Sequence, residues 1–202
     1  MRQIIYVKYN RTRSEKFQLK TAIVRENGAL SVEKTALTEA GAGHMGSFWE
    51  KYQMIREQNP RIRFLEPEFK DGGKTVCFRY LEGETLADAL ADRIHMGQIP
   101  YEELEQVMAL VFPEDFSVDS GHFSIKEQTG GPFAPSQGFT EVFGPVPEGL
   151  EELGRLTAAP NVDGLFENLM ISGGHVYGID YEWVFDMEIP ARFLHYRNLL
   201  YF

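Results

Sequence analysis

The most constraining feature of this 202-residue sequence is a short hairpin that carries polar residues at both of its ends. Two brief apolar runs, residues 169–171 and 176–179, are separated by a Ser-Gly-Gly-His segment, which predicts an antiparallel strand pair with a tight turn. Asn168 begins the first strand, Asp180 ends the second, and Asp163 lies in the preceding loop. Because a tight turn brings the ends of a hairpin together, we expect these three side chains to lie close to one another.

Oxygen-bearing side chains grouped in this way suit a hard cation. Mg²⁺ takes one or two protein oxygens together with phosphate oxygens and water, so Asn168 and Asp180 are candidate metal ligands. A carboxylate that is not bound to the metal can orient or deprotonate a hydroxyl nucleophile, which is the role expected for Asp163. Taken singly, Asp163 and Asn168 would instead be explained as turn and capping residues.

This segment resembles the catalytic core of the kinases, in which an aspartate stands five residues before a metal-binding asparagine and a second metal-binding aspartate follows. Asp163 and Asn168 have that spacing, and Asp180 stands where the second aspartate belongs. The Ile-Asp-Tyr-Glu form of residues 179–182 is more similar to the aminoglycoside and choline kinase branch than to the protein kinases. Glu182 is then either a second metal ligand or a structural carboxylate.

The N-terminal part of the chain predicts a three-stranded meander over residues 4–36. Polar and apolar residues alternate from residue 17 to residue 23, and Asn27-Gly28 is a hairpin turn signal. Lys34 falls on the inward face of the third strand, among apolar residues. Burying a lysine is costly, so we expect a partner or a ligand for it.

The kinase resemblance gives Lys34 a role, since the small lobe of kinases uses a lysine on its third strand to bind the α- and β-phosphates, together with a helix glutamate. We expect a helix over residues 44–57, in which Glu50 is the first candidate for that glutamate, and Glu39 is the second. The alternatives are a snorkelling Lys34 and an ordinary exposed glutamate at position 50. The segment 78–83 (FRYLEG) resembles the hinge of the family.

Further elements follow from local signals. Strands are expected over residues 62–67 and 75–80, and helices over residues 86–94 and 100–111, with Thr85 as the N-cap of the first helix. A short helix near 147–157 and an apolar helix over 190–202 complete the chain. Because the sequence ends inside an apolar pattern, we expect it to be a piece of a longer protein.

Residues 113–149 hold five Pro and six Gly, so we expect little regular structure there. The segment also contains several phenylalanines, which indicates that it packs against the rest of the chain. One interpretation is a segment packed over the second lobe. The other is a substrate lid or a dimer contact.

Together these features predict an α+β chain with a two-lobed protein-kinase-like fold. The small N-terminal lobe would comprise residues 1–84, an antiparallel sheet plus one helix. The large lobe, residues 85–202, would be reduced and mainly helical, with the catalytic-type hairpin in segment 161–182. The order of the expected elements (three strands, a helix, two strands, a linker and a helical lobe) matches that family.

Three segments carry a closer resemblance, namely VEKTALTEA (32–40), FRYLEGETL (78–86) and IDYEWVFDMEIP (179–190). They are similar to kinase-like domains attached to glycosyltransferase or methyltransferase modules in large bacterial surface-polysaccharide proteins. This resemblance implies an adjoining module as a partner.

Composition limits the partners further. A formal net charge of -10 disfavours nucleic acid and anionic membrane surfaces, which require a basic footprint. No apolar run approaches the ~20 residues of a membrane-spanning helix. Cys77 is the only cysteine, so no internal disulfide can form, which fits a reducing cytoplasmic location.

The function that the resemblance implies is magnesium-dependent phosphoryl transfer from ATP to a hydroxyl of a small molecule or sugar. Asp163 would act on the acceptor hydroxyl, and Asn168 and Asp180 would hold Mg²⁺. Lys34, fixed by Glu50, would hold the nucleotide phosphates.

Three departures from the kinase pattern support an alternative. Asn161 stands where kinases have histidine, the first hairpin loop over residues 10–16 has no glycine to cover phosphates, and the large lobe is short. Arg11, Arg13 and Lys16 in that loop either contact phosphate or form a solvated basic turn. The alternative is a catalytically inactive kinase-like domain that binds or scaffolds a neighbouring glycosyltransferase. A phosphotransferase inactivated by truncation is the third possibility.

Overall fold

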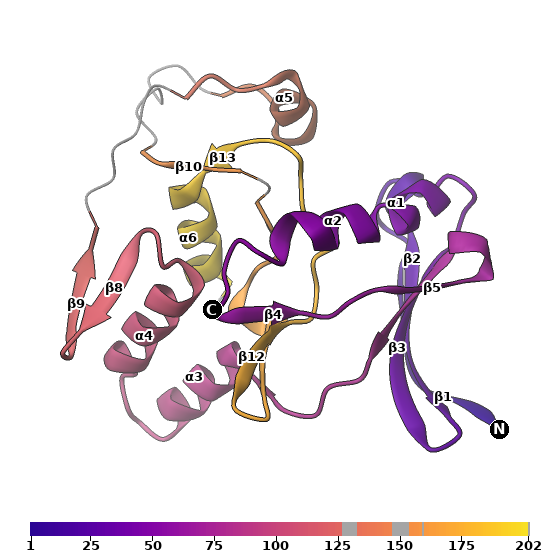
Figure 1. Cartoon of the computed structure of the whole chain (residues 1–202), viewed down its shortest axis with the longest axis horizontal. Helices are drawn as coiled ribbons and strands as arrows, with labels where there is room; N and C mark the ends of the chain where they lie inside the picture. Colours follow the sequence, from indigo (N-terminus) through magenta and orange to yellow (C-terminus); the bar gives the residue numbers. More distant parts are fainter. Residues whose placement is uncertain (127–132, 147–153, 159, 202) are drawn as a thin grey trace. The chain divides into compact units, whose positions relative to one another are not determined.

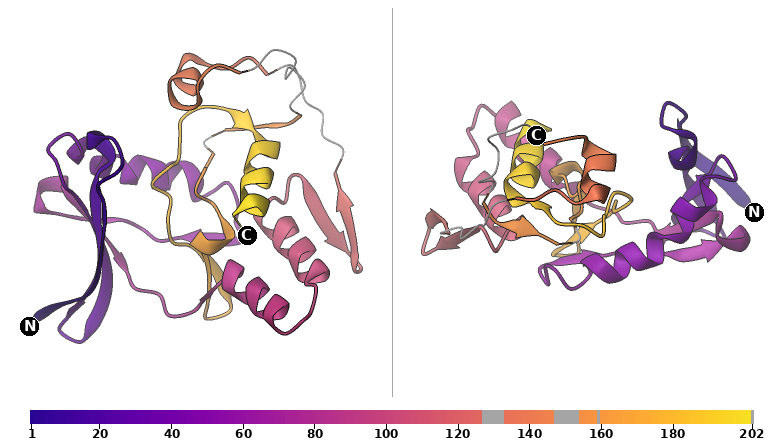
Figure 2. Two further views of the ribbon diagram at one scale, coloured as in Figure 1. Left: turned by 180° about the vertical axis from the view of Figure 1, so that it is seen from behind. Right: turned by 90° about the horizontal axis from the view of Figure 1, so that it is seen from above.

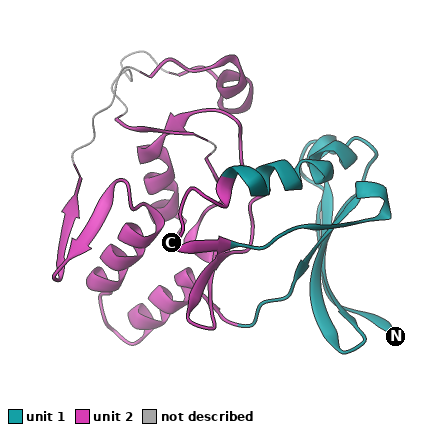
Figure 3. Cartoon of the chain, in the orientation of Figure 1, with its two compact units in different colours: residues 1–54, 64–82 teal, residues 55–63, 83–202 magenta. Residues whose placement is uncertain are grey.

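The computed structural model describes residues 1–126, 133–146, 154–158 and 160–201 (Figures 1 and 2). The described residues form a mixed α+β structure, which confirms the coarse fold class. They divide into two compact units (Figure 3): unit 1 comprises Met1–Met54 and Phe64–Glu82, and unit 2 comprises Ile55–Arg63 and Gly83–Phe202. The second boundary between the units lies between Glu82 and Gly83, and the short segment 55–63 belongs to unit 2.

Unit 1 is built on a five-stranded antiparallel sheet with the order β1-β2-β3-β6-β5. Its strands are β1 (Arg2–Asn10), β2 (Leu19–Glu26), β3 (Ala29–Ala36), β5 (Glu68–Lys70) and β6 (Thr75–Arg79). The predicted turn between β2 and β3 is confirmed, since Asn27 and Gly28 have positive φ values of 51° and 86°. This conformation suits the right-handed twist of a hairpin.

The helix expected over residues 44–57 is divided into α1 (Ala42–Gly46) and α2 (Phe48–Ile55). Ser47 lies at the break, and its hydroxyl donates to the carbonyl oxygen of His44 at 2.8 Å. Such local hydrogen bonds of serine compete with the helical pattern, and the glycine at 46 weakens it further. Two 3₁₀ turns, η1 (Glu15–Phe17) and η2 (Asp71–Gly73), complete unit 1.

The hairpin expected in segment 161–182 is confirmed in unit 2. It consists of β11 (Leu169–Ser172) and β12 (His175–Gly178), which pair antiparallel. The turn contains Gly173 and Gly174, both with positive φ. The hairpin belongs to a four-stranded sheet of order β4-β12-β11-β7, with β4 (Ile62–Phe64) and β7 (Glu84–Thr85) at its edges. The strand expected over 62–67 is thus shorter and lies in this sheet, not in that of unit 1.

The described helices of unit 2 are α3 (Leu86–His95), α4 (Tyr101–Val111), α5 (Gln137–Phe143) and α6 (Ala191–Leu200). The N-cap prediction is confirmed, because Thr85 Oγ1 accepts a hydrogen bond from the backbone N–H of Asp88 at 3.0 Å. Among the helices that the structure describes, none is long and apolar enough to cross a membrane.

The expectation of little regular structure over 113–149 is wrong for its described part. Strands β8 (Phe116–Asp119) and β9 (His122–Ile125) form a hairpin, and α5 follows. Glycine does not disrupt regular structure here, because the hairpin turn requires positive φ values, which Ser120 and Gly121 adopt. Packing of the aromatic residues is confirmed: Phe139 lies 4.9 Å from Phe143, and Phe143 lies 5.9 Å from Phe185, between ring centroids.

Only part of the helix expected over 147–157 can be compared with the structure. Residues 147–153 lie outside the described residues. Leu156–Thr157 is a short strand, β10, which pairs with β13 (Ile189–Pro190) just before α6. In the described part of this segment the helix prediction is therefore wrong.

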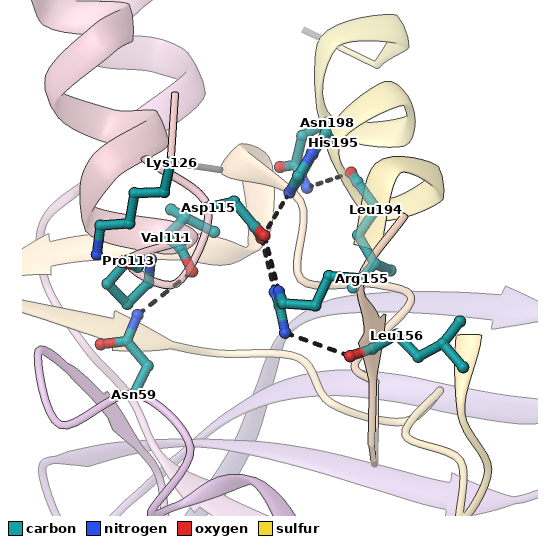
Figure 4. Close-up of polar contacts among 10 residues, drawn as sticks. All are labelled: Asn59, Val111, Pro113, Asp115, Lys126, Arg155, Leu156, Leu194, His195 and Asn198. Atoms are coloured by element: carbon teal, nitrogen blue, oxygen red, sulfur yellow. Dashed lines mark hydrogen bonds and ion pairs between the residues drawn. The ribbon is translucent and has the colours of Figure 1, made fainter. Parts of the chain in front are cut away.

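A cluster centred on Asp115 anchors α6 (Figure 4). The buried Asp115 carboxylate accepts hydrogen bonds from Nε and Nη2 of Arg155 at 2.7 and 2.6 Å, and His195 Nε2 lies 3.0 Å from it. Burial alone would raise the pKa of this carboxyl group, but the hydrogen bonds from Arg155 and His195 outweigh burial and hold the pKa well below its usual range. The cluster joins three segments and fixes the helix that carries Arg197 and Asn198.

Candidate functional site

The loop that carries Asp163 is held against the segment that follows β12. The backbone N–H of Val162 donates to the carbonyl oxygen of Trp183 at 3.0 Å, and that of Phe185 donates to Pro160 at 3.3 Å. These two backbone hydrogen bonds place the Asp163 loop beside the residues around Asp180.

Asn161 links the two segments through its side chain. Its Oδ1 accepts a hydrogen bond from the backbone N–H of Asp163 at 3.2 Å, and its Nδ2 donates to the carbonyl oxygen of Asp180 at 3.2 Å. Both amide atoms are therefore used, with donor and acceptor each facing a complementary group. The residue that departs from the kinase pattern thus performs a positioning role, which the sequence did not reveal.

Asn168 is fixed to the same loop. It ends the 3₁₀ turn η3 (Phe166–Asn168), and its Nδ2 donates to the carbonyl oxygen of Asp163 at 2.9 Å. Its own carbonyl oxygen accepts from the backbone N–H of Ile179 at 2.9 Å, directly before Asp180. The structure therefore brings together the segments of all three residues that we expected to converge.

Two residues of α6 complete the surroundings of Asp163. Arg197 Nε donates to the carbonyl oxygen of Val162 at 3.1 Å, and its Nη2 lies 3.4 Å from Asp163 Oδ1. Asn198 Nδ2 donates to the carbonyl oxygen of Gly164 at 3.2 Å. We did not predict either contact, because a helix more than 30 residues downstream gives no spacing signal in the sequence.

Asp180 and Glu182 form a tight local turn, in which Asp180 Oδ1 accepts from the backbone N–H of Glu182 at 3.2 Å. Asp180 is half-buried, whereas Glu182 is 2% exposed. A metal-binding and a structural carboxylate are both compatible with such burial, so the two interpretations of Glu182 remain predictions.

Asn168 and Asp180 offer an amide oxygen and a carboxylate, which are oxygen ligands of the kind that Mg²⁺ takes. Within the described part of the chain, no three His, Cys, Asp or Glu side chains are grouped so that they could hold a metal. Asn168 uses its amide N–H₂ for the loop and keeps its Oδ1 atom without a hydrogen bond to any described residue. This oxygen and the Asp180 carboxylate match the small number of protein ligands that Mg²⁺ requires.

In unit 1, Lys34 is buried on β3 as expected, with 5% of its surface exposed. Its Nζ lies 5.9 Å from the centroid of the Phe48 ring, within the range of a cation–π interaction. This burial argues against the alternative of a snorkelling lysine.

The ion pair expected between Lys34 and Glu50 is not found among the described residues. Glu50 is exposed, and Glu39, the second candidate, instead binds Lys74 at 2.5 Å. Glu50 lies away from Lys34 because α2 buries a different face. Phe48 and Ile55 are both buried, and Lys51 lies on their side of the helix. The inward charged residue of α2 is therefore a lysine.

Lys51 is only 8% exposed and lies near the same aromatic ring as Lys34. Its Nζ is 5.5 Å from the centroid of Phe48 and 3.4 Å from Nδ1 of His44. Unit 1 thus gathers two buried lysines around one phenylalanine. The sequence suggested only Lys34, because the break at Ser47 that sets the helix face was not foreseen.

The first hairpin loop folds back on itself without glycine. Gln18 Nε2 donates to the carbonyl oxygens of Arg11 and Arg13 at 3.2 and 3.0 Å. Arg11 lies over the ring of Tyr9 and Lys16 over that of Phe17, each at 4.9 Å. Both cations are exposed, in agreement with the alternative of a solvated basic turn.

A groove of about 420 Å³ lies in unit 2 at the turn end of the hairpin. Its walls come from α3, α4 and the residues around Gly174 and His175, and Arg93 and Glu103 form an ion pair in it at 3.2 Å. Asn168 and Asp180 lie at the other end of the two strands, so the groove is separate from the candidate metal ligands.

No model of a known protein family matches this sequence, and no curated protein matches it.

Proposed function

We propose that the chain is a magnesium-dependent phosphotransferase of the two-lobed kinase-like fold, which transfers a phosphoryl group from ATP to a hydroxyl of a small molecule or sugar. The observation that carries this proposal is the hydrogen-bonded link from Asp163 through Asn161 to Asp180, with Asn168 bound to the same loop. Phosphoryl transfer relies mainly on positioning and on charge stabilisation. A carboxylate and two metal ligands fixed to one framework would serve both.

Each residue has a defined task in this proposal. Asn168 Oδ1 and the Asp180 carboxylate would hold Mg²⁺, which neutralises charge on the β- and γ-phosphates when it is bound. Lys34 would bind the α- and β-phosphates. Asp163 would accept a hydrogen bond from the acceptor hydroxyl and so orient its oxygen.

The neighbour of Asp163 refines that role. Arg197 places a guanidinium 3.4 Å from Asp163 Oδ1, which holds this carboxylate in a defined orientation. Little proton removal is needed in a loose phosphoryl-transfer transition state. Orientation of the hydroxyl is thus the better role for Asp163.

The arrangement of unit 1 supports the finer fold proposal. A three-stranded meander, β1-β2-β3, is followed by α1 and α2 and then by β5 and β6, which extend the same sheet. This is the order that the kinase resemblance implies for the small lobe. The proposal places the domain in the cytoplasm, where ATP is available.

Isothermal titration calorimetry of ATP with and without Mg²⁺ tests the proposal. We expect saturable, magnesium-dependent binding that weakens at least tenfold in Asp180→Ala. Asp186→Ala is the matched control, because Asp186 is an exposed aspartate of the same segment. Absence of binding at millimolar ATP in the folded protein would contradict the proposal, and so would equal affinity in Asp180→Ala.

A second candidate function is a catalytically inactive kinase-like domain that scaffolds an adjoining glycosyltransferase or methyltransferase module. The exposed Glu50, which forms no ion pair with Lys34 among the described residues, favours it, because kinases fix their phosphate-binding lysine through such a pair. Consumption of ATP, followed by ³¹P NMR in the presence of a panel of sugars, separates the two. Turnover that requires Asp163 supports the enzyme, and nucleotide binding without turnover supports the scaffold.

A further inference from the structure

The strand β1 leaves one long edge of the unit 1 sheet open. Among the strands that the structure describes, β1 pairs only with β2, at the end of the order β1-β2-β3-β6-β5 (Figures 1 and 2). Its outer side therefore presents backbone N–H and C=O groups along nine residues, whereas the other edge strand, β5, has only three. An open edge of this length is a template for another strand.

The side chains of β1 are exposed as well. Five large apolar residues have between 41% and 50% of their surface exposed: Ile4, Ile5, Tyr6, Val7 and Tyr9. Protein sheets protect their edges with short strands, proline, charged residues or bulges. In β1 the protection consists of one irregularity between Ile4 and Tyr6 and the charges of Arg2 and Lys8, and the strand has no proline.

The N-terminal segment that contains β1 has a charge opposite to that of the whole chain. The first 20 residues hold six of the 20 Lys and Arg residues and only one of the 30 Asp and Glu residues. Arg2 is bound to Glu33 at 2.6 Å, whereas Lys8 is exposed in the strand and forms no ion pair with a described residue. A strand with acidic side chains would place opposite charge next to Lys8. A second copy of β1 would bring the same basic residues.

We propose that β1 binds an extended acidic segment of another protein, which joins the unit 1 sheet as an additional strand. Main-chain hydrogen bonds along the open edge would provide most of the affinity. Alternate apolar side chains of the segment would cover Ile4, Val7 and their neighbours, and its carboxylates would face Lys8. This surface is independent of the residues assigned to phosphoryl transfer.

Fluorescence anisotropy of labelled peptides with the full chain tests the proposal. The probe is a ten-residue peptide in which Val and Glu alternate. The controls are the same peptide with Lys for each Glu, and the acidic peptide with two Val replaced by Pro. We expect saturable binding of the first probe alone, at least tenfold tighter than either control and weaker at high salt. Hydrogen exchange of the β1 amides should slow when the probe binds.

Two variants locate the site on β1. Ile4→Ser/Val7→Ser should weaken binding at least tenfold, and Lys8→Gln should weaken it and reduce its salt dependence without a change in melting temperature. Ile94→Ser is the matched control, because Ile94 is 51% exposed on α3 in unit 2. It should bind the probe like the unmodified chain.

Three outcomes would overturn the proposal. The first is no saturable binding of the acidic probe at millimolar concentration. The second is binding that does not distinguish the probe from the basic or proline-containing peptide, or that does not change exchange in β1. The third is a concentration-dependent dimer, measured by analytical ultracentrifugation, in which the β1 amides are protected without any peptide. That result would assign the edge to a second copy of the chain.

Discussion

The side-chain amide of Asn168 donates a hydrogen bond to the backbone carbonyl oxygen of Asp163 at 2.9 Å. The five-residue spacing between them is thus also a structural link, because the asparagine holds the loop in which the aspartate lies. This hydrogen bond uses Nδ2 of Asn168 and not Oδ1, which is the atom that could bind a metal. One side chain can therefore serve both the loop and the ion.

Asn161 should contribute strongly to the stability of unit 2. Asn161→Ala removes the bonds to the Asp163 N–H and the Asp180 carbonyl oxygen, and we expect the free energy of unfolding to fall by about 1–3 kcal/mol. Urea unfolding measures this change. Asn10→Ala, at the end of β1, is the control and should have an effect below about 0.5 kcal/mol. Equal values for the two variants would show that the Asn161 link contributes no stability.

Substitution of Asp115 should strongly lower the free energy of unfolding, because its cluster holds unit 2 together. Asp115→Asn leaves Arg155 and His195 without their carboxylate, and breaking a buried ion pair costs about 3–5 kcal/mol. Asp119→Asn is the matched control, because Asp119 is an exposed aspartate of β8, the strand that begins directly after Asp115. Urea unfolding should show the loss in the first variant alone. Two variants of similar stability would contradict this role of the cluster.

Because of the same cluster, the free energy of unfolding should depend on pH in the acid range. The pKa of Asp115 is lowered in the folded state, so below the ordinary carboxyl pKa of about 4 the unfolded chain binds a proton that the folded chain does not. The contribution of Asp115 is therefore complete above that pH and is lost as the pH falls further. Urea unfolding between pH 7 and pH 3 should show a steeper decline in the unmodified chain than in Asp115→Asn, by up to about 1.4 kcal/mol per pH unit. Parallel declines would rule out this contribution.

Cys77 should be unreactive in the folded chain. It is buried on β6, and burial raises the pKa of its thiol, although Lys70 opposes this effect. Because the thiolate is the nucleophile, we expect the thiol to react with a disulfide reagent at pH 8 at least about 100-fold more slowly than in the urea-unfolded chain. Complete reaction within minutes in the native state would contradict the burial of this residue.

Local sequence signals predicted the elements that depend on interactions between residues close together in the sequence. The Asn27-Gly28 turn, the Thr85 cap and the β11–β12 hairpin depend on positive φ values, one capping bond and short apolar runs. The β8–β9 hairpin could not be predicted in this way, because a high content of glycine and proline generally indicates irregular structure. At Gly121 the glycine is instead the residue that the hairpin turn requires.

Contacts between distant segments could not be predicted from spacing. Asp115 meets Arg155 and His195 across 40 and 80 residues, and Asp163 meets Arg197 across 34. For Lys34 and Glu50 the prediction depended on one continuous helix, and the break at Ser47 turned Lys51 inward instead. The segments of Asp163, Asn168 and Asp180 were predicted to converge because a hairpin with a tight turn allows few other arrangements.

Binding of Mn²⁺, a spectroscopic substitute for Mg²⁺, can be followed by electron paramagnetic resonance with ATP present and reports on Asn168 and Asp180 as metal ligands. We expect ATP-dependent Mn²⁺ binding to the unmodified chain. It should be lost in Asp180→Ala, weakened in Asn168→Ala, partly restored in Asn168→Asp, which keeps an oxygen ligand, and unchanged in Asp186→Ala. Mn²⁺–ATP binding that is the same in the unmodified chain and all four variants, or no binding to the unmodified chain, would contradict the assignment of Asn168 and Asp180 as metal ligands.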